Sequence, residues 1–504
     1  MRKINTIKPF ALFLTIFLFG SPLAAQSVYL VKDILPGSMD GVGQPGSYII
    51  ATLDTIAVMI GRSASNQNVM WSSDGTEAGT QIIIPAGGSY PCFTQAYGKL
   101  WLMREGTSNS LEVWESDGTP AGTKKRHTTI GSAQKIVAFQ GSLFYSSGNK
   151  LMKYDTSAHT VSVVTTFSPF DAVYDLAAMP DKLLLISQKT GGLKLFISDG
   201  TDAGTVGIYD LNWLNDDNYH LTVAGDKAYF FAALGDGTET FYVTDGTADG
   251  TLPLIEEKAP HYDFDALGTS LEWNDKFLFQ AEGPDGSGSR DLYITDGTVG
   301  GTIKLQNIYT DPDILHLTPY KDKVYFSVEG GFVDIWETDG TITGTKKTFQ
   351  PFEFPYSGYG LAVFQDSLVF SGYDSNFEGG LFASAGDFPS VRLISNAVGG
   401  FNGNFMPTPA KMFFINYDEE HGRELWAYDP FKITIGTSED TDQERRLVIA
   451  PNPSGDFCNI ALPSSLQSYC HLTLTDLTGR LVIRLESTGQ QEIQLNLSGL
   501  PAGL

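Results

Sequence analysis

The residues of this chain that could do chemistry are aspartates that recur at a regular spacing. Six ten-residue segments share an opening aromatic residue, an Asp-Gly-Thr triplet and a closing Gly-Thr pair. The aspartates of these segments are Asp74, Asp117, Asp199, Asp245, Asp296 and Asp339. Recurring carboxylates could bind cations, but one carboxylate about every 45 residues lacks the dense cluster of oxygen ligands that calcium prefers. We therefore interpret these aspartates as structural and expect no cofactor, with calcium left open at the acidic loops 215–218 (NDDN) and 310–313 (TDPD).

The other candidate chemical groups are isolated. The seven histidines occur singly, with neither a His-Glu-x-x-His motif nor a Cys/His spacing that suits zinc. Residues 61–65 (GRSAS) lack the second glycine of a hydrolase nucleophile elbow. His421 follows the acidic residues 418–420 (DEE), which could ligate a cation but more often form a solvated hairpin tip. The sequence thus favours a protein without catalytic residues.

Each residue type in the ten-residue segment has a physical role in a tight turn. An aspartate side chain accepts hydrogen bonds from backbone N–H groups about two residues ahead, which forms an Asx-turn. The glycine that follows supplies a positive φ that a β-carbon would penalise. The threonine hydroxyl can bond back across the loop. The opening aromatic residue is large enough to wedge against the next repeat unit, and we expect this of Trp71, Trp114, Trp336 and Trp426.

The segments mark an internal repeat, and a second landmark supports the same count. Three decayed copies at residues 152–156, 382–386 and 426–430 bring the number of units to nine. About twenty residues before each copy, a small polar pair precedes an apolar run, as at residues 226–227 (DK). This landmark also occurs nine times. Two landmarks that agree indicate a real structural unit.

The content of each unit predicts the fold. Four short apolar runs joined by turn residues are typical of a four-stranded β-propeller blade. A β-helix coil is normally shorter, and an immunoglobulin-like sandwich needs about twice the residues. The sequence therefore predicts an all-β fold, a β-propeller of eight or nine four-stranded blades over residues 26–436, since one decayed unit could be an insertion. Residues 28–35 (VYLVKDIL) should complete the last blade, built from residues 410–429, because such closure removes two sheet edges.

These motifs resemble the ELWxxDGT repeat family of secreted proteins, found mainly in Bacteroidetes. Residues 424–426 (ELW) match the opening of the family motif, and the six DGTxxGT segments match its close. The resemblance covers residues 28–430 and implies export and a propeller-like fold, without common catalytic residues. Two copies depart from the motif, since the one at Asp155 lacks the glycine and the one at Phe382 lacks the aspartate.

The N-terminus and the bulk composition bound the possible partners. Residues 1–25 combine basic residues, a short apolar run and small residues at a cleavage site, the pattern of a signal peptide, and the run is too short for a comfortable membrane span. No later stretch approaches a membrane span. The formal net charge of −25, from 58 acidic and 33 basic residues, argues against nucleic acid as a partner. Among three cysteines, Cys458 and Cys470 could form one local disulfide or stay as free thiols.

The C-terminal part has a different character. Residues 437–446 (TSEDTDQERR) predict a linker, and residues 447–504 predict a small β-sandwich. Residues 450–454 (APNPS), 474–482 (LTDLTGRLV) and 497–504 (LSGLPAGL) resemble the C-terminal sorting domain of the type IX secretion system. The resemblance implies the secretion machinery as a partner. Because members of that family continue with one more strand, we expect this copy to be truncated, and an ordinary adhesive module is the alternative.

Two functions of different class are compatible with the sequence. The first is a non-enzymatic binding or adhesion module, monomeric and secreted or held at the outer cell surface after export through the periplasm, with a glycan or protein ligand. The alternative is a secreted hydrolase or lyase with its site in the propeller channel. An enzyme should show a polar cluster that differs between units, whereas the visible differences are mostly losses of turn residues. We therefore expect the binding module.

Overall fold

The chain is almost entirely β-structure. The computed structural model describes residues 13–17, 28–42, 49–133, 135–167, 172–189, 192–212, 219–233, 239–255, 270–282, 290–306, 313–329, 333–349, 360–373, 379–396, 401–430, 448–450, 457–461, 470–475, 481–487 and 492–496. Within these ranges, the helices are two short 3-10 turns, Thr107–Asn109 and Phe388–Ser390. No helix of the described part is long and apolar enough to cross a membrane. Contacts divide the chain into a large unit, Gln26–Lys432, and a small unit that joins Met1–Ala25 to Ile433–Leu504.

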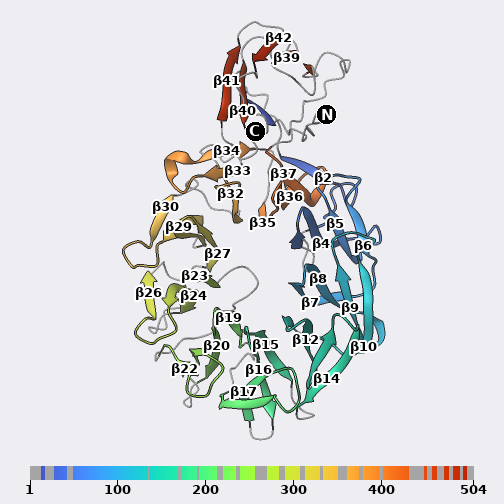
Figure 1. Ribbon diagram of the computed structural model, residues 1–504, viewed down its shortest axis with the longest axis vertical. Coiled ribbons are helices and arrows are strands. Elements are labelled where there is room, and N and C mark those ends of the chain that lie inside the picture. The colour runs from blue at the N-terminus through green and yellow to red at the C-terminus, as the bar shows by residue number, and fades with distance from the viewer. Residues whose placement is uncertain are drawn as a thin grey trace, which may run out of the picture. The chain divides into compact units, whose positions relative to one another are not determined.

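The large unit is a β-propeller of nine four-stranded antiparallel blades, which Figure 1 shows around a ring. The strands of blades 1 to 3 are β3 (Ile49–Leu53), β4 (Ile56–Arg62), β5 (Asn68–Ser73), β6 (Gln81–Ile84); β7 (Ser89–Ala96), β8 (Lys99–Glu105), β9 (Ser110–Ser116), β10 (Lys124–Ile130); β11 (Ile136–Phe139), β12 (Ser142–Ser147), β13 (Lys150–Asp155) and β14 (Thr160–Thr166). Those of blades 4 to 6 are β15 (Val173–Ala178), β16 (Leu183–Lys189), β17 (Gly192–Ser198), β18 (Val206–Asp210); β19 (Thr222–Ala224), β20 (Lys227–Ala233), β21 (Glu239–Thr244), β22 (Leu252–Pro253); β23 (Ser270–Trp273), β24 (Lys276–Glu282), β25 (Arg290–Thr295) and β26 (Ile303–Gln306). Those of blades 7 to 9 are β27 (Asp313–Tyr320), β28 (Lys323–Glu329), β29 (Val333–Thr338), β30 (Lys346–Phe349); β31 (Leu361–Phe364), β32 (Ser367–Tyr373), β33 (Gly379–Ser384), β34 (Arg392–Ser395); β35 (Phe401–Pro407), β36 (Met412–Asp418), β37 (Gly422–Tyr428) and β2 (Val28–Lys32).

The position of a strand within its blade explains its composition. The first strand of each of blades 1 to 8 lies at the inside of the ring and the fourth at the outside (Figure 1). Neighbouring blades cover both faces of the middle strands, so β4 (IAVMIGR) has five consecutive buried residues. The outer strand β10 (KKRHTTI) has none that is buried and is accordingly polar. The apolar core therefore lies between blades, as where Val58 of blade 1 shares a cluster with Leu100 of blade 2.

The ring closes with a strand from the N-terminus, as predicted. β2 pairs antiparallel with β37, with Val28 opposite Tyr428 and Leu30 opposite Trp426. The chain then turns toward blade 1 through residues 33–42. Backbone N–H groups of Gly41 and Val42 donate to the Arg423 carbonyl oxygen at 3.0 and 3.1 Å. Blade 9 is thus built from both ends of the propeller sequence.

All nine repeat units are blades, so the alternative of eight blades and an insertion is wrong. The decayed copies occupy the same place as the intact ones, at the ends of the third strands β13, β33 and β37. The loss of motif residues has therefore not removed the strand pairing of those units.

The described residues of the small unit form two three-stranded sheets. One pairs β1 (Phe13–Phe17) with β40 (Cys470–Thr475) and β41 (Leu481–Ser487). The other pairs β38 (Val448–Ala450), β39 (Phe457–Ala461) and β42 (Glu492–Asn496). The predicted linker, residues 437–446, and the side chains of Cys458 and Cys470 lie outside the described residues, so the linker, the disulfide and the signal peptide stay predictions.

Candidate functional site

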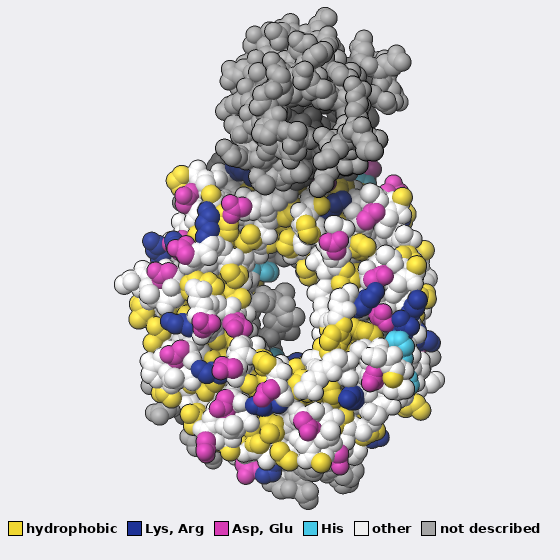
Figure 2. All heavy atoms as spheres, in the orientation of Figure 1, with side chains coloured by type: hydrophobic (Ala, Val, Ile, Leu, Met, Phe, Trp, Pro, Cys, Tyr) yellow, Lys and Arg dark blue, Asp and Glu magenta, His cyan; other side chains and the backbone are white. Residues whose placement is uncertain are grey.

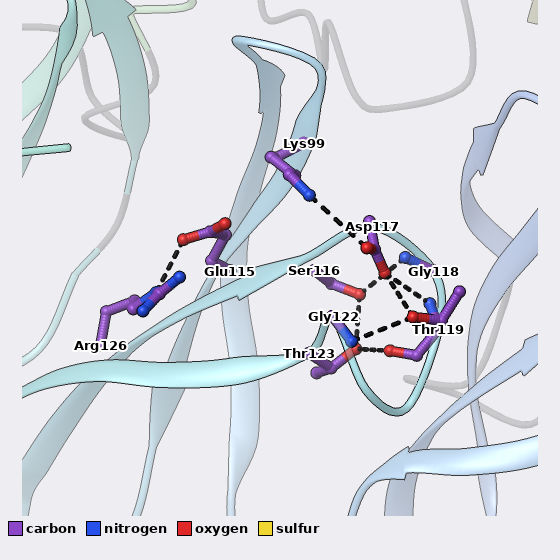
Figure 3. Close-up of polar contacts among 9 residues, drawn as sticks. All are labelled: Lys99, Glu115, Ser116, Asp117, Gly118, Thr119, Gly122, Thr123 and Arg126. Carbon is purple, nitrogen blue, oxygen red and sulfur yellow. Dashed lines mark hydrogen bonds and ion pairs between the residues drawn. The ribbon is translucent and has the colours of Figure 1, made fainter. Parts of the chain in front are cut away.

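The six intact motif turns share one set of hydrogen bonds, which Figure 3 shows for blade 2. Asp117 Oδ1 accepts from the backbone N–H of Thr119 at 2.9 Å and from its hydroxyl at 2.7 Å. Gly118 has a φ of 85°, the left-handed region that favours glycine. The hydrogen bonds from Thr119 hold the pKa of Asp117 below its usual value. These are the contacts of an Asx-turn, and the second carboxylate oxygen, Oδ2, lies 3.5 Å from Lys99 Nζ of the same blade (Figure 3).

The second half of the motif locks the turn onto the strand end. Thr123 Oγ1 donates to the Thr119 carbonyl oxygen at 2.7 Å and lies 2.7 Å from Ser116 Oγ (Figure 3). Gly122 donates its N–H to Thr119 Oγ1 at 3.0 Å. A β-carbon on Gly122 would lie 2.0 Å from an oxygen of Asp117, so only glycine fits here without moving the carboxylate. The equivalent close approaches occur at Gly79, Gly204, Gly250, Gly301 and Gly344.

The aromatic residue that opens the motif packs against the preceding blade, not the next one as predicted. Trp71 of blade 1 shares its cluster with Phe413 and Ile415 of blade 9. Trp336 of blade 7 shares its cluster with Leu278 of blade 6. The remaining two behave alike: Trp114 faces blade 1, and Trp426 faces blade 8. The predicted packing of the aromatic residue between two blades is therefore observed, but its partner is the preceding blade and not the following one.

The two sequence landmarks meet across blade boundaries. In three blades, the lysine of the polar pair donates to the carbonyl oxygen at the aspartate position of the next blade. Lys411 of blade 9 reaches Asp74 of blade 1 at 2.9 Å, and the corresponding distance from Lys182 of blade 4 to Asp245 of blade 5 is 3.3 Å. The same contact links blades 5 and 6. We call this the hairpin-to-turn contact. This contact was not predicted from the sequence, although the two landmarks follow each other in the same order in every unit and could have indicated it.

The decayed turns are rebuilt with other donors and acceptors. Asp155 still accepts from the N–H groups of Ser157 and Ala158 at 2.9 and 2.8 Å, despite the missing glycine. Where blade 8 has Ala385 in place of the aspartate, Ser390 Oγ accepts the N–H of Ala385 at 2.8 Å. The doubt that the sequence raised about these two turns is thereby resolved. The motif is a structural turn that tolerates substitution.

Polar groups that do not repeat lie on the inner strands of blades 3 to 5. Lys135, just before β11, donates through Nζ to Asp175 of β15 and, at 3.1 Å, to the carbonyl oxygen of Leu221. Asp175 also accepts the backbone N–H groups of Leu176 and Leu221. Three consecutive blades are joined by this network. Figure 2 shows the ring open at its centre, where these inner strands lie.

Two histidines share a strained backbone on inner strands farther along the ring. His220 precedes β19 and His316 lies in β27, each within a His-Leu-Thr sequence. Their φ angles are 41° and 59°, which is uncommon for residues with a β-carbon. The hydroxyls of Thr222 and Thr318 donate to the histidine carbonyl oxygens at 3.4 and 2.7 Å. Strained residues of this kind concentrate at functional sites.

The remaining candidates from the sequence carry little chemistry. His421 Nδ1 lies 2.9 Å from the carboxylate of Asp418, which also accepts the N–H groups of Glu420 and His421, so this hairpin tip is held by its own residues. Loops 215–218 and 310–312, with the side chain of Asp313, lie outside the described residues. Within the described part, no group of three or more His, Cys, Asp and Glu side chains could hold a metal ion.

Comparison with known proteins identifies the C-terminal region. Residues 448–504 match the family model of the secretion system C-terminal sorting domain. The match confirms the predicted type IX sorting domain, whereas the ELWxxDGT family and the bacterial group stay predictions. The sorting domain implies export to a secreted or cell-surface location and the secretion machinery as a partner. No curated protein matches the chain significantly.

Several solved structures match this chain at low sequence identity. The propeller domain of the Trilobed protease from Pyrococcus furiosus is 16% identical, with 69% of this chain and 98% of that chain covered and a TM-score of 0.36. Saccharomyces cerevisiae Sqt1 is 13% identical, covering 68% and 96%, with a TM-score of 0.39. Puromycin hydrolase is 11% identical, covering 72% and 55%, with a TM-score of 0.39. These likenesses carry no argument about activity or ligand. By its own strand topology and the matched family model, the chain is a nine-bladed β-propeller protein with a C-terminal type IX sorting domain, exported to a secreted or cell-surface location.

Proposed function

We propose that the propeller is a non-enzymatic binding module whose ligand, an extracellular glycan, contacts the inner strands of blades 3 to 7. The observation that supports this most is the distribution of non-repeating polar residues. The motif residues recur from blade to blade, whereas Lys135, Asp175, His220 and His316 follow no motif shared by all blades and lie on or just before the inner strands of blades 3, 4, 5 and 7. Ligand-contacting residues are expected where a repeat scaffold varies.

The distribution of exposed apolar residues favours a glycan over a protein. Large apolar side chains that are exposed lie mainly on the fourth strands and in the turns, including Ile82, Val206, Leu252, Ile303 and Ile342. The inner strands instead carry partly exposed polar residues, namely Lys135, His220 and His316, while the carboxylate of Asp175 is buried in its ion pair with Lys135. The buried centre of a protein interface is apolar, whereas a sugar is bound through hydrogen bonds from placed polar groups. A protein ligand is therefore the less favoured outcome.

An enzymatic role has less support from the contacts. Asp175 is the carboxylate at the centre of the inner network, and three donors already occupy it. A general base must be free to take a proton from its substrate. These contacts therefore do not bring together the acid and base groups that a hydrolase or lyase with a site in the channel would need.

Glycan-array binding by the exported protein tests the proposal. The variants H220A and H316A change the inner strands, and H421A is the matched control at a hairpin tip. We expect the wild type and H421A to bind the same glycans and the inner-strand variants to lose at least tenfold in affinity. Binding that survives both inner-strand variants, or turnover of any bound glycan, would overturn the proposal.

A further inference from the structure

Four blades carry a buried carboxylate two residues before the motif aromatic of the third strand. These residues are Glu112 of blade 2, Asp291 of blade 6, Asp334 of blade 7 and Glu424 of blade 9. Each is at most 7% exposed, and Asp291 and Glu424 are fully buried. A buried charge costs free energy unless it is paired. The partner of each carboxylate is therefore the informative feature.

In three of the four blades a lysine from the fourth strand pairs with the carboxylate, and in blade 2 Arg104 also pairs with Glu112, at 2.7 Å. Lys125 lies 3.1 Å from Glu112, and Lys347 lies 2.7 Å from Asp334. Lys304 pairs with Asp291. In each case the strand register sets this lysine opposite the motif aromatic, as Lys347 stands opposite Trp336. The lysine is thus a regular part of the blade wherever it carries this carboxylate.

Blade 9 has the carboxylate without the lysine. Its fourth strand is β2, and Leu30 stands opposite Trp426 where the other blades have lysine. The nearby Lys32 donates instead to the Thr80 carbonyl oxygen of blade 1 at 3.0 Å. No ion pair to Glu424 is present among the described residues. The difference arises because the N-terminal strand, and not a regular fourth strand, fills this position.

Glu424 uses one carboxylate oxygen to hold the loop that follows β2. Oε1 accepts the backbone N–H groups of Leu35 and Gly41, both at 3.1 Å. The approach is so close that a β-carbon on Gly41 would lie 2.3 Å from this oxygen. The other oxygen, Oε2, is buried and accepts no hydrogen bond.

Two further buried oxygens without hydrogen-bond partners lie on β36 and just after β2, the two strands that flank β37. Asn416 stands directly opposite Glu424 on β36, is fully buried, and has both amide atoms unpartnered. Directly opposed residues of an antiparallel pair have β-carbons about 4.5–5.5 Å apart on one face. On the other side, Asp33 comes one residue after Lys32, which pairs with Leu425, and its Oδ1 is buried and unpartnered. Asn416 on β36, Glu424 on β37 and Asp33 just after β2 thus each carry a buried oxygen without a hydrogen-bond partner.

The two neighbouring carboxyl groups, those of Asp33 and Glu424, favour a positive charge beside them. Burial, followed by the nearby charge of Asp33, raises the pKa of Glu424 to about 8. Two carboxyl groups beside each other cannot both ionise cheaply without a counter-cation. Carboxylate and amide oxygens are the ligands that hard cations such as calcium prefer.

We propose that Asp33, Asn416 and Glu424 bind one hard cation of the calcium class, which replaces the lysine of blades 2, 6 and 7. The ion ties β2 and the loop at residues 33–42 to β36 and β37, so it clamps the strand that closes the ring. Two carboxylates and one amide form a smaller donor set than a dedicated cluster of acids, so backbone oxygens or water complete the coordination. A proton on Glu424 is the competing occupant, and the cation displaces it.

The test measures calcium binding by the exported full-length protein after removal of metal with EDTA. Isothermal titration with calcium should detect a site whose affinity increases from pH 6 to pH 9, because a proton competes with the ion. Glu424→Gln should weaken this site at least tenfold, while the amide oxygen that it introduces can still accept the Leu35 and Gly41 N–H groups. Asn416→Asp adds a ligand charge and should tighten the site.

Asp334→Asn is the matched control, because it removes the equivalent carboxylate in a blade that has its lysine. It should keep the calcium affinity of the wild type. The proposal is overturned if calcium, magnesium, sodium and potassium all fail to bind, or if E424Q binds calcium as the wild type does. A third result would also overturn the proposal: E424Q melts at a higher temperature than the wild type, and calcium does not change the melting temperature of the wild type. The carboxyl group of Glu424 would then be protonated and not bound to a cation.

Discussion

Replacing Gly301 by alanine should loosen one motif turn, whereas replacing the adjacent Gly300 should not. A β-carbon on Gly301 would lie 2.0 Å from Asp296 Oδ1, far inside van der Waals contact, and one on Gly300 would meet nothing within 4 Å. Neither glycine has a positive φ, so backbone strain does not separate the two variants. The Gly301→Ala variant must therefore move the Asp296 carboxylate away from the two hydrogen bonds that Thr298 donates at 2.9 and 2.7 Å.

The magnitude follows from those two bonds. A hydrogen bond to a charged group contributes about 1.5–3 kcal/mol, but Asp296 is exposed, so we take about 2 kcal/mol for the pair. With an unfolding entropy of ~2.1 cal/mol/K per residue, a propeller of about 400 residues has ~0.85 kcal/mol/K. The melting temperature of Gly301→Ala should then fall by ~2 °C. Gly300→Ala should stay within ~0.5 kcal/mol of the wild type.

Calorimetry and hydrogen exchange should be measured side by side on the two variants. Because a chain of this size need not unfold in one step, the exchange rate of the Thr298 amide is the decisive local readout. It should rise in Gly301→Ala and stay unchanged in Gly300→Ala. Equal exchange in the two variants would show that the contact between Asp296 and the second glycine does not hold the turn.

Trp336→Ala should reduce the free energy of unfolding by about 3–5 kcal/mol in denaturant titration, because it leaves a cavity between blades 6 and 7, and Trp336→Phe should recover most of the loss. Lys411→Met removes one exposed hairpin-to-turn contact, to Asp74, and should cost less than ~1 kcal/mol in the same titration. In EDTA, the free energy of unfolding of the wild type, compared with that of E424Q, should decrease as the pH rises from about 4.5 to about 8. Across this range the folded state keeps the proton of Glu424, whose pKa is about 8, and the unfolded state has lost it.

Most of the features that the sequence predicted have partners that lie close along the chain. The acceptor Asp117 and its donor Thr119 are two residues apart, so residue types alone indicate the turn. The number of blades follows from two landmarks within each unit. Closure by residues 28–35 was also predictable, because that segment has the pattern of a fourth strand without a turn before it.

Contacts between blades could not be predicted in the same way. A repeat places the preceding and the following unit at equal distances along the sequence, so the side that Trp336 faces depends on the twist of the blade and not on spacing. For the same reason, the contact from Lys182 to the carbonyl oxygen of Asp245 could not be predicted from the spacing. The inner network was hidden for another reason, since Lys135, Asp175 and Leu221 belong to three units and follow no shared motif.

In blade 9, the residues that depart from the repeat are those that surround the proposed cation site. In blades 2, 6 and 7, the buried carboxylate of the third strand has a lysine of the fourth strand as its partner. β2 enters blade 9 from the other end of the sequence, and it brings Leu30 to the position of the lysine. Cleavage near Ala25, as predicted, would place β2 at the start of the mature chain, where few preceding residues could anchor it. Its attachment then depends on the residues after it, through Arg423 with Asp40 and through Glu424 with the loop at residues 33–42.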